Sequence, residues 1–159
     1  MTKEIKNNIQ KVQDKLKELG FSYQVVELPQ TTHTALDAAK ALSCNIGQIA
    51  KSIIFKSKNS NQPILVIASG SNRINEKKIR EYLAESIEKA DADFVLKQTG
   101  FVIGGVAPIG HLKKIETFID QDLLQYNEIW TAAGSPKAVF KLKPKDLIKM
   151  TNGQIVSIK

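Results

Sequence analysis

The sequence predicts a single α/β domain of the α+β kind, in which helices surround a mixed, partly barrel-like central β-sheet. Its 159 residues suit one domain with a full hydrophobic core. Strand-like apolar stretches recur between segments with helical periodicity. Some of these strands are spaced as hairpins and others are separated by helices, which favours a mixed sheet. No repeat, low-complexity segment or linker divides the chain, so we expect residues 1–159 to form one domain.

The chain opens with a predicted amphipathic helix that ends at Gly20. Its apolar residues recur at helical spacing and are Ile5, Ile9, Val12, Leu16 and Leu19. FSYQVVE (residues 21–27) then alternates as a strand. Thr34, with Asp37 three residues later, is similar to a capping box, so we expect a helix over residues 35–43.

The middle of the chain carries the predicted centre of the sheet. CNIGQIAK (44–51) predicts a short helical turn that leads into the strand SIIFK (52–56). PILVIAS (63–69) is apolar on both faces, as a central strand would be. INEKKIREYLAESI (74–87) predicts an amphipathic helix, and after a short connection FVIGG (101–105) predicts a short apolar strand.

The last third alternates short strands with brief helices. The predicted elements are the strand KIETFID (114–120), the helix DLLQY (122–126), the strands EIWTAAG (128–134) and AVFKL (138–142), a helix from Pro144 to about Met150, and the strand IVSI (155–158).

The net charge and the cysteine content limit the kinds of partner and the cellular compartment that we expect for this protein. A formal net charge of +7 favours an anionic partner, with nucleic acid as the usual case. The alternative is a lysine-rich surface produced by biased composition. A single cysteine, Cys44, excludes an internal disulfide, and without a signal peptide we expect a cytoplasmic protein. The apolar stretches are too short to cross a bilayer, so no membrane partner is expected.

The chain lacks the sequence motifs of several common binding and catalytic sites. The chain contains no GxGxxG, no GxxxxGK[ST] and no GxSxG. His33, His111 and Cys44 do not have the spacing of a zinc site, so we expect neither a metal nor another cofactor. Cys44 itself is expected to be a buried, inert thiol.

Lys51 is the first unusual residue. Strand alternation places it on the apolar side, with Ile53 and Phe55. Its ammonium can simply extend outward into water. The functional alternative is a lysine at the rim of an apolar pocket, where it would meet an anionic or carbonyl oxygen.

The second unusual stretch is TGFVIGGVAPIGH, residues 99–111. Gly104 and Gly105 permit unusual dihedral angles and close approach of another molecule, and Pro108 fixes its own φ. The amides of Gly105, Val106 and Ala107 can then point into one concavity that binds oxygen atoms. The plainer alternative is a sharp turn out of a strand.

Together these stretches resemble the YbaK and prolyl-tRNA synthetase-associated domain family, the aminoacyl-tRNA deacylases. The matching segments are the lysine in QIAKSIIF, the G-x-x-x-P loop Gly104–Pro108 within TGFVIGGVAPIG, and WTAAGSPKAVFKLKPKDLIKMTNG. The resemblance runs from about Phe21 to the C-terminus. Two features depart from some members: Val139 stands where they carry an acidic residue, and residues 28–34 lack their aromatic side chains.

The resemblance implies hydrolysis of the ester that joins a wrong amino acid to tRNA, a trans-editing step in the cytoplasm. The expected substrate is tRNA-Pro carrying alanine, cysteine, serine or 2-aminobutyrate. Prolyl-tRNA synthetase is a further implied partner, and we expect a monomer or weak dimer. The implied catalytic residues are Lys51, Gly104 and Gly105, and the implied substrate-binding residues are Val106, Ala107, Pro108, His111, Thr34, Ala133, Gly134 and Ser135.

The implied mechanism uses neither a metal nor a covalent nucleophile. Loop amides would stabilise the developing oxyanion, Lys51 would add positive charge, and the terminal ribose hydroxyl of the substrate would handle the proton. A small apolar cavity would admit alanine-sized side chains and exclude proline. Two other functions stay open from the sequence: a non-catalytic tRNA- or RNA-binding module, and a protein that binds free amino acids.

Overall fold

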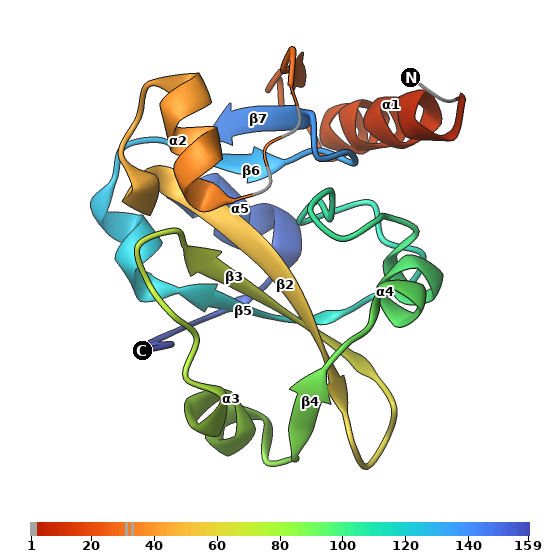
Figure 1. Ribbon diagram of the computed structural model, residues 1–159, viewed down its shortest axis with the longest axis vertical. Coiled ribbons are helices and arrows are strands. Elements are labelled where there is room, and N and C mark those ends of the chain that lie inside the picture. Colours follow the sequence, from red (N-terminus) through yellow and green to blue (C-terminus); the bar gives the residue numbers. More distant parts are fainter. Residues whose placement is uncertain (1–2, 31, 33) are drawn as a thin grey trace.

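The computed structural model describes residues 3–30, 32 and 34–159 (Figure 1). The strands are β1 (Val26–Glu27), β2 (Ile49–Ser57), β3 (Pro63–Ser69), β4 (Ile87–Lys89), β5 (Glu116–Asp120), β6 (Ile129–Ala132), β7 (Ala138–Leu142) and β8 (Gln154–Val156). The helices are α1 (Lys3–Glu18), α2 (Ala35–Leu42), α3 (Glu76–Leu83), α4 (Ala92–Thr99) and α5 (Pro144–Thr151), with short 3-10 helices η1 (Ile46–Gln48) and η2 (Gln121–Gln125).

The strands form one mixed sheet, as predicted. Its order is β1-β7-β6-β2-β3-β5-β8, and β4 also pairs with β2. The pairs β2–β3, β2–β4, β6–β7 and β1–β7 are antiparallel, whereas β2–β6, β3–β5 and β5–β8 are parallel. The helices pack around this sheet (Figure 1). The prediction of a single α/β domain with helices around a mixed sheet is confirmed.

One edge of β2 contains a gap in strand pairing. Along its other edge β2 pairs with β3 over residues 50–56. On the gapped edge β6 pairs only with Ile49 and Ala50, and β4 pairs only with residues 55–57. Residues 51–54 therefore have no strand beside them on that edge within the described part of the chain. A gap of this kind leaves main-chain donors and acceptors free for other groups.

Apolar side chains cover both faces of the sheet. On one face Ala50 and Ile54 of β2 belong to a large buried cluster with Val106 and Ala107. On the other face Phe55 belongs to a second cluster, with α3 and β3. The segment that follows α4 therefore packs against the Ala50 face, directly beside the gap.

The structure corrects two predictions for the middle region. The predicted helix over 74–87 is shorter: Asn75 caps its start, and Ala84 ends it in the left-handed conformation. The last residue of that prediction, Ile87, begins β4, because pairing with β2 stabilises the extended chain there. The predicted connection before residue 101 contains α4, which begins where the Asp91 side chain accepts a hydrogen bond from the Phe94 amide.

FVIGG is not a strand. The Gly105 N–H donates to the Val102 carbonyl at 2.9 Å, which closes a turn in place of a β-ladder.

At the N-terminal side, only Val26 and Glu27 of the predicted strand 21–27 pair with the sheet. The final strand also ends earlier than predicted, at Val156.

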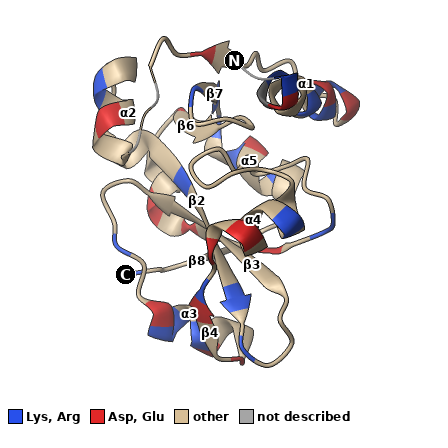
Figure 2. Ribbon diagram, turned by 45° about the vertical axis from the view of Figure 1, so that its right-hand side comes forward, with Lys and Arg blue, Asp and Glu red and all other residues tan. Residues whose placement is uncertain are grey.

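The described residues contain no helix that is long and apolar enough to cross a membrane. Basic and acidic residues are interspersed on α1, α3 and α4 (Figure 2). The net positive charge is therefore not concentrated in a single helix.

Candidate functional site

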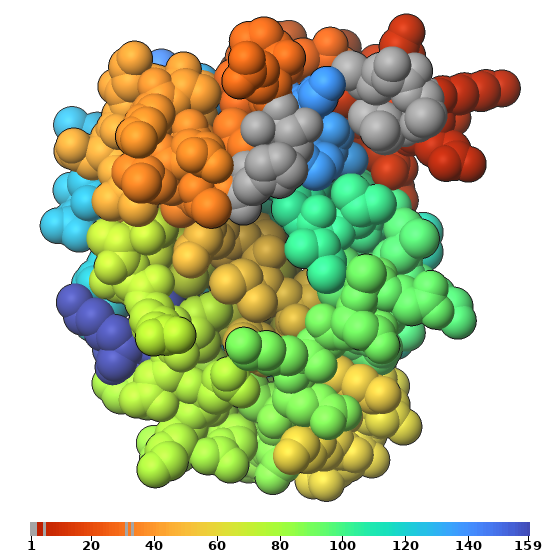
Figure 3. All heavy atoms as spheres, viewed as in Figure 1, coloured from red at the N-terminus to blue at the C-terminus, as the bar shows by residue number. Residues whose placement is uncertain are grey.

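A hollow with two arms lies beside the gap in β2. Figure 3 shows β2, in gold, at the floor of this hollow, with α2 on one side and α4 with the following loop on another. One arm, the α2 arm, has a volume of about 380 Å³, and the other, the α4 arm, about 590 Å³. Both are of the size that small ligands occupy. The two arms form one site because they share Lys51, Ser52, Ile53, Ile103, Gly104 and Val106.

The α2 arm is enclosed by α2, β6 and the turn between β6 and β7. Thr34 lies at its edge as the N-cap of α2, where its Oγ1 accepts a hydrogen bond from the Asp37 amide at 3.0 Å. Trp130 and Thr131 of β6 contribute one wall, and Ser135 of the turn contributes another. This arm therefore combines apolar surface with several hydroxyl groups.

The α4 arm is lined by more charged groups. Lys51, Arg73 and Lys89 line it, with Glu76 as the one acidic residue among its described lining residues. Its apolar wall includes Ile53, Phe55, Ile74 and Val95. An excess of cationic side chains beside apolar surface suits a ligand that carries both a phosphate and a planar or aliphatic group.

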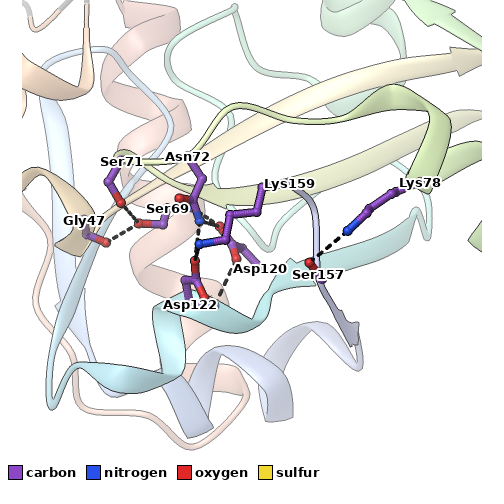
Figure 4. A network of polar contacts seen from close by, with 9 residues as sticks. All are labelled: Gly47, Ser69, Ser71, Asn72, Lys78, Asp120, Asp122, Ser157 and Lys159. Atoms are coloured by element: carbon purple, nitrogen blue, oxygen red, sulfur yellow. Dashed lines mark hydrogen bonds and ion pairs between the residues drawn. The ribbon is translucent and has the colours of Figure 1, made fainter.

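A polar network holds the segment that carries Arg73 in place (Figure 4). The buried carboxylate of Asp120 accepts hydrogen bonds from the Ser69 amide and the Asn72 side chain, both at 2.9 Å. Asn72 also donates to Asp122 at 2.8 Å, and Lys159 forms an ion pair with Asp122 at 2.9 Å. Because several donors converge on these two carboxylates, the wall of the α4 arm is fixed from behind.

The Gly104–Pro108 loop approaches the β6–β7 turn closely. The Gly134 N–H donates to the Gly105 carbonyl at 3.0 Å. A Cβ atom on Gly105 would lie 2.8 Å from the Ser135 Cα, so only glycine permits this approach. Gly104 has φ +87°, a left-handed conformation that also favours glycine. The glycine pair therefore serves close packing of the loop against the turn.

The loop amides differ from the prediction. The Gly105 N–H donates within the loop to Val102, so it is not free to bind a ligand. Val106 and Ala107 are buried, and in the described part of the chain their N–H groups make no hydrogen bond. Buried amides are nearly always paired, and Val106 lines both arms whereas Ala107 lines neither, so the Val106 N–H is the one of these two donors that a ligand in the hollow can reach.

His111 supports the loop from behind. Its Nε2 lies 2.6 Å from the Ala107 carbonyl, and because a carbonyl only accepts, Nε2 donates. Burial lowers the pKa of His111 below its usual value of 6.5, and the positive charge of Lys11 lowers it further, whereas the bond to Ala107 acts in the opposite direction. The imidazole is therefore held neutral while it anchors the loop.

This arrangement predicts an acid-sensitive contribution to stability. Because the pKa of His111 is lower in the folded than in the unfolded chain, the unfolded chain binds the extra proton first as the pH falls through about 6.5. We expect the free-energy advantage of the parent protein over His111→Gln to shrink between roughly pH 7.5 and pH 5.5. Urea unfolding at a series of pH values measures this difference. An advantage that stays constant with pH contradicts the assignment.

A protein-family comparison identifies the chain. The model of the aminoacyl-tRNA editing domain matches residues 29–150, which is most of the sequence. The chain belongs to the aminoacyl-tRNA editing family. This family implies a misacylated tRNA as its class of substrate.

Individual relatives agree with this assignment to the editing family. The uncharacterised protein YwhH of Bacillus subtilis is 30% identical over 131 residues, covering 82% of this chain and 83% of YwhH. EbsC of Enterococcus faecalis, a proposed Cys-tRNA(Pro)/Cys-tRNA(Cys) deacylase, is 26% identical and covers 79% of this chain and 76% of EbsC. A proline–tRNA ligase of Brachyspira hyodysenteriae is 33% identical over 121 residues, which is 73% of this chain and 21% of the ligase.

A solved structure has the same fold. The crystal structure of a proposed trans-editing enzyme for prolyl tRNA synthetase superposes with a TM-score of 0.91 and 36% sequence identity. The match covers 100% of this chain and 98% of that one. The fold of this editing-family chain is therefore shared over its whole length.

The structure brings some of the predicted site residues of this editing-family chain together. Those that line the arms are Lys51, Gly104, Val106, Thr34 and Ser135. Those that do not line either arm are Gly105, Ala107, Pro108, His111, Ala133 and Gly134. The second group lies in or behind the loop and the turn, where it shapes the walls. His33, which the sequence analysis considered only as a zinc ligand, lies outside the described residues.

The polar residues of the site that sequence reasoning missed include Ser52, Arg73, Lys89 and Thr131. Ser52 adjoins Lys51 in the strand, and strand alternation alone would have turned its side chain to the opposite face. The gap in β2 places both residues at the same hollow. No signal in the sequence marked Thr131, which occurs in an otherwise ordinary strand.

Proposed function

We propose that this chain hydrolyses the ester bond of a misacylated tRNA, with tRNA-Pro as carrier of a small non-cognate amino acid. One observation carries the proposal: Lys51 and the Gly104–Pro108 loop, which are far apart in sequence, line the same two-armed hollow. Membership of the editing family and the similarity to EbsC support it.

In this mechanism the ester carbonyl binds to the loop. The free N–H group of Val106 stabilises the oxyanion that develops when water attacks. The Lys51 ammonium adds positive charge at the same point. Because an aminoacyl ester is already activated, correct placement of water and carbonyl supplies much of the acceleration. The adjacent ribose hydroxyl of the tRNA takes the proton that the attacking water loses and supplies one to the ribose oxygen that leaves when the ester bond breaks, and the reaction needs no metal.

The two arms divide the substrate between them. The aminoacyl group occupies the α2 arm, because that arm is the smaller and more enclosed by secondary structure. The terminal nucleotide occupies the α4 arm, where Arg73 and Lys89 face its phosphate and the apolar wall faces its base or sugar. Lys51 stands where the arms join, beside the ester.

The decisive experiment measures deacylation of one tRNA-Pro that carries alanine, serine, cysteine, 2-aminobutyrate or proline. We expect catalytic turnover of at least one small aminoacyl ester and protection of the prolyl ester. Arg73→Ala and Lys89→Ala should weaken tRNA binding more at low than at high salt and make the affinity less sensitive to salt, as the loss of a phosphate contact does. Salt-sensitive tRNA binding with no turnover on the whole panel would instead support a non-catalytic binding module.

A free amino acid is the remaining alternative substrate. The cationic α4 arm argues against this alternative, because a free amino acid that fits the α2 arm would leave the α4 arm without a ligand. Equal affinity for serine and for its tRNA ester in a binding assay would support the alternative.

A further inference from the structure

Two hydroxyl groups of the α2 arm lack partners. Ser52 Oγ and Thr131 Oγ1 are buried and make no hydrogen bond with any described residue. Thr131 as a whole retains only 2% of its surface exposed. Most buried polar groups are paired, because a buried hydroxyl without a partner has lost its hydrogen bonds to water and gained none in return. Two such groups in one cavity indicate a ligand that pairs with them.

Both hydroxyls lie on the same face of the sheet. Ala50 of β2 stands opposite Thr131 in the parallel pairing with β6, and Ser52 follows two residues later on the same face. Ala50 belongs to the same buried cluster as Val106. The two hydroxyls therefore lie on the face where the Gly104–Pro108 loop packs, and Val106 of that loop lines the α2 arm with them.

Ser52 also directs its main chain into the gap. The Ile49 carbonyl accepts from the Gly70 amide at 2.7 Å, and the Ser57 amide donates to the Gln62 carbonyl at 2.9 Å, both toward β3. Main-chain groups alternate between the two edges of a strand. The N–H and C=O of Ser52 therefore face the unpaired edge. This one residue offers three polar groups at the cavity.

We propose that the α2 arm selects an aminoacyl group whose side chain carries a hydroxyl, that of serine or threonine, by hydrogen bonds to Ser52 and Thr131. The inference rests on the proposed hydrolysis of misacylated tRNA and names its preferred substrates. It differs from the sequence-based expectation of an apolar cavity that selects aminoacyl groups by the size of their side chains alone.

The chemistry of the arm favours a neutral partner over the α-ammonium group. None of the described residues that line the α2 arm is acidic, and Lys51 is among them. An ammonium buried at these two hydroxyls would lack a counter-charge and be repelled by a like charge, so they pair with the side chain of the aminoacyl group and not with its α-amine. A hydroxyl both donates and accepts, so it can pair with both Ser52 Oγ and Thr131 Oγ1.

Such a site discriminates against an aminoacyl group that leaves the protein hydroxyls without hydrogen-bond partners. An alanyl group fits a cavity of this volume but leaves both protein hydroxyls without partners. We expect kcat/KM for seryl-tRNA-Pro to exceed that for alanyl-tRNA-Pro by at least about tenfold. Threonyl-tRNA-Pro should exceed valyl-tRNA-Pro, whose side chain has the same shape, by a similar or larger factor.

The test compares these pairs in the parent protein and in two variants. Thr131→Val keeps the shape of the buried side chain, and Ser52→Ala removes only the hydroxyl of the other. We expect each variant to bring the seryl-to-alanyl ratio of kcat/KM several-fold closer to one. Thr117→Val is the matched control, because Thr117 is buried in β5 and its hydroxyl donates to the Ile115 carbonyl, away from the site. It should keep the parent ratio.

The outcomes separate this inference from the function on which it rests. Equal kcat/KM for seryl and alanyl esters, with a ratio that Thr131→Val does not change, would overturn hydroxyl selection and leave the hydrolase intact. The same result is expected if an ordered water alone pairs with the two hydroxyls. No turnover of any ester would overturn both.

Discussion

Lys51→Ala should lower kcat/KM for deacylation by about 10²- to 10³-fold while the protein stays folded. The ammonium of Lys51 is the cationic group that lines both arms of the hollow, so its loss removes positive charge where the ester and its oxyanion lie. Lys51→Arg should not restore full activity, because the larger, planar guanidinium places its charge differently. Single-turnover kinetics on the preferred ester measure the effect.

Lys56→Ala is the matched control for this variant. Lys56 is in the same strand, but its ammonium lies over the Phe94 ring at 5.3 Å and does not line either arm. It should keep activity within about twofold of the parent, as a surface substitution away from the site does. A Lys51→Ala protein as active as Lys56→Ala would refute the catalytic role of Lys51.

Gly105→Ala is expected to have the second large effect, on both activity and stability. The added methyl would lie 2.8 Å from the Ser135 Cα and 2.9 Å from the Ser135 amide nitrogen, both main-chain atoms that cannot rotate away. The loop must therefore separate from the turn and weaken the bond from the Gly134 amide to the Gly105 carbonyl. We expect a loss of about 1–3 kcal/mol in unfolding free energy. Activity should fall about 10²-fold, because a displacement of about 1 Å moves the Val106 amide.

Gly20→Ala separates this local clash from the general cost of replacing glycine. Gly20 has φ +87°, but a Cβ atom there would meet nothing within 4 Å. This variant should lose about 1 kcal/mol of stability and keep its activity. The interpretation fails if Gly105→Ala matches Gly20→Ala in both chemical denaturation and deacylation.

Much of the fold could be predicted from local patterns. The helical spacing of α1, the apolar run of β3 and the capping residue Thr34 each depend on neighbours within a few positions, and all three elements form as expected. The errors concern short elements whose state depends on distant partners. Residues 87–89 are extended because they pair with β2, and their local sequence continues the preceding helical pattern.

The candidate site could likewise be predicted only in part from the sequence. Lys51 and the Gly104–Pro108 loop could be chosen from the sequence because their residue types and spacing resemble a family pattern. The close packing that the two glycines permit could not be predicted, since it depends on the distance between the loop and the β6–β7 turn. His111 bonds to the Ala107 carbonyl and lines neither arm, so its role concerns the loop.

By itself, the sequence determined the types of most elements, the mixed sheet and the family, because hydrophobic period, caps and motif spacing are properties of neighbouring residues. Only the tertiary structure decided that β6 and β4 pair with different parts of β2 and leave residues 51–54 open between them. The same long-range pairing left Ser52 and Thr131 without partners. A hydroxyl in a strand looks ordinary in sequence, and what lies opposite it after folding decides whether it is satisfied or available to a substrate.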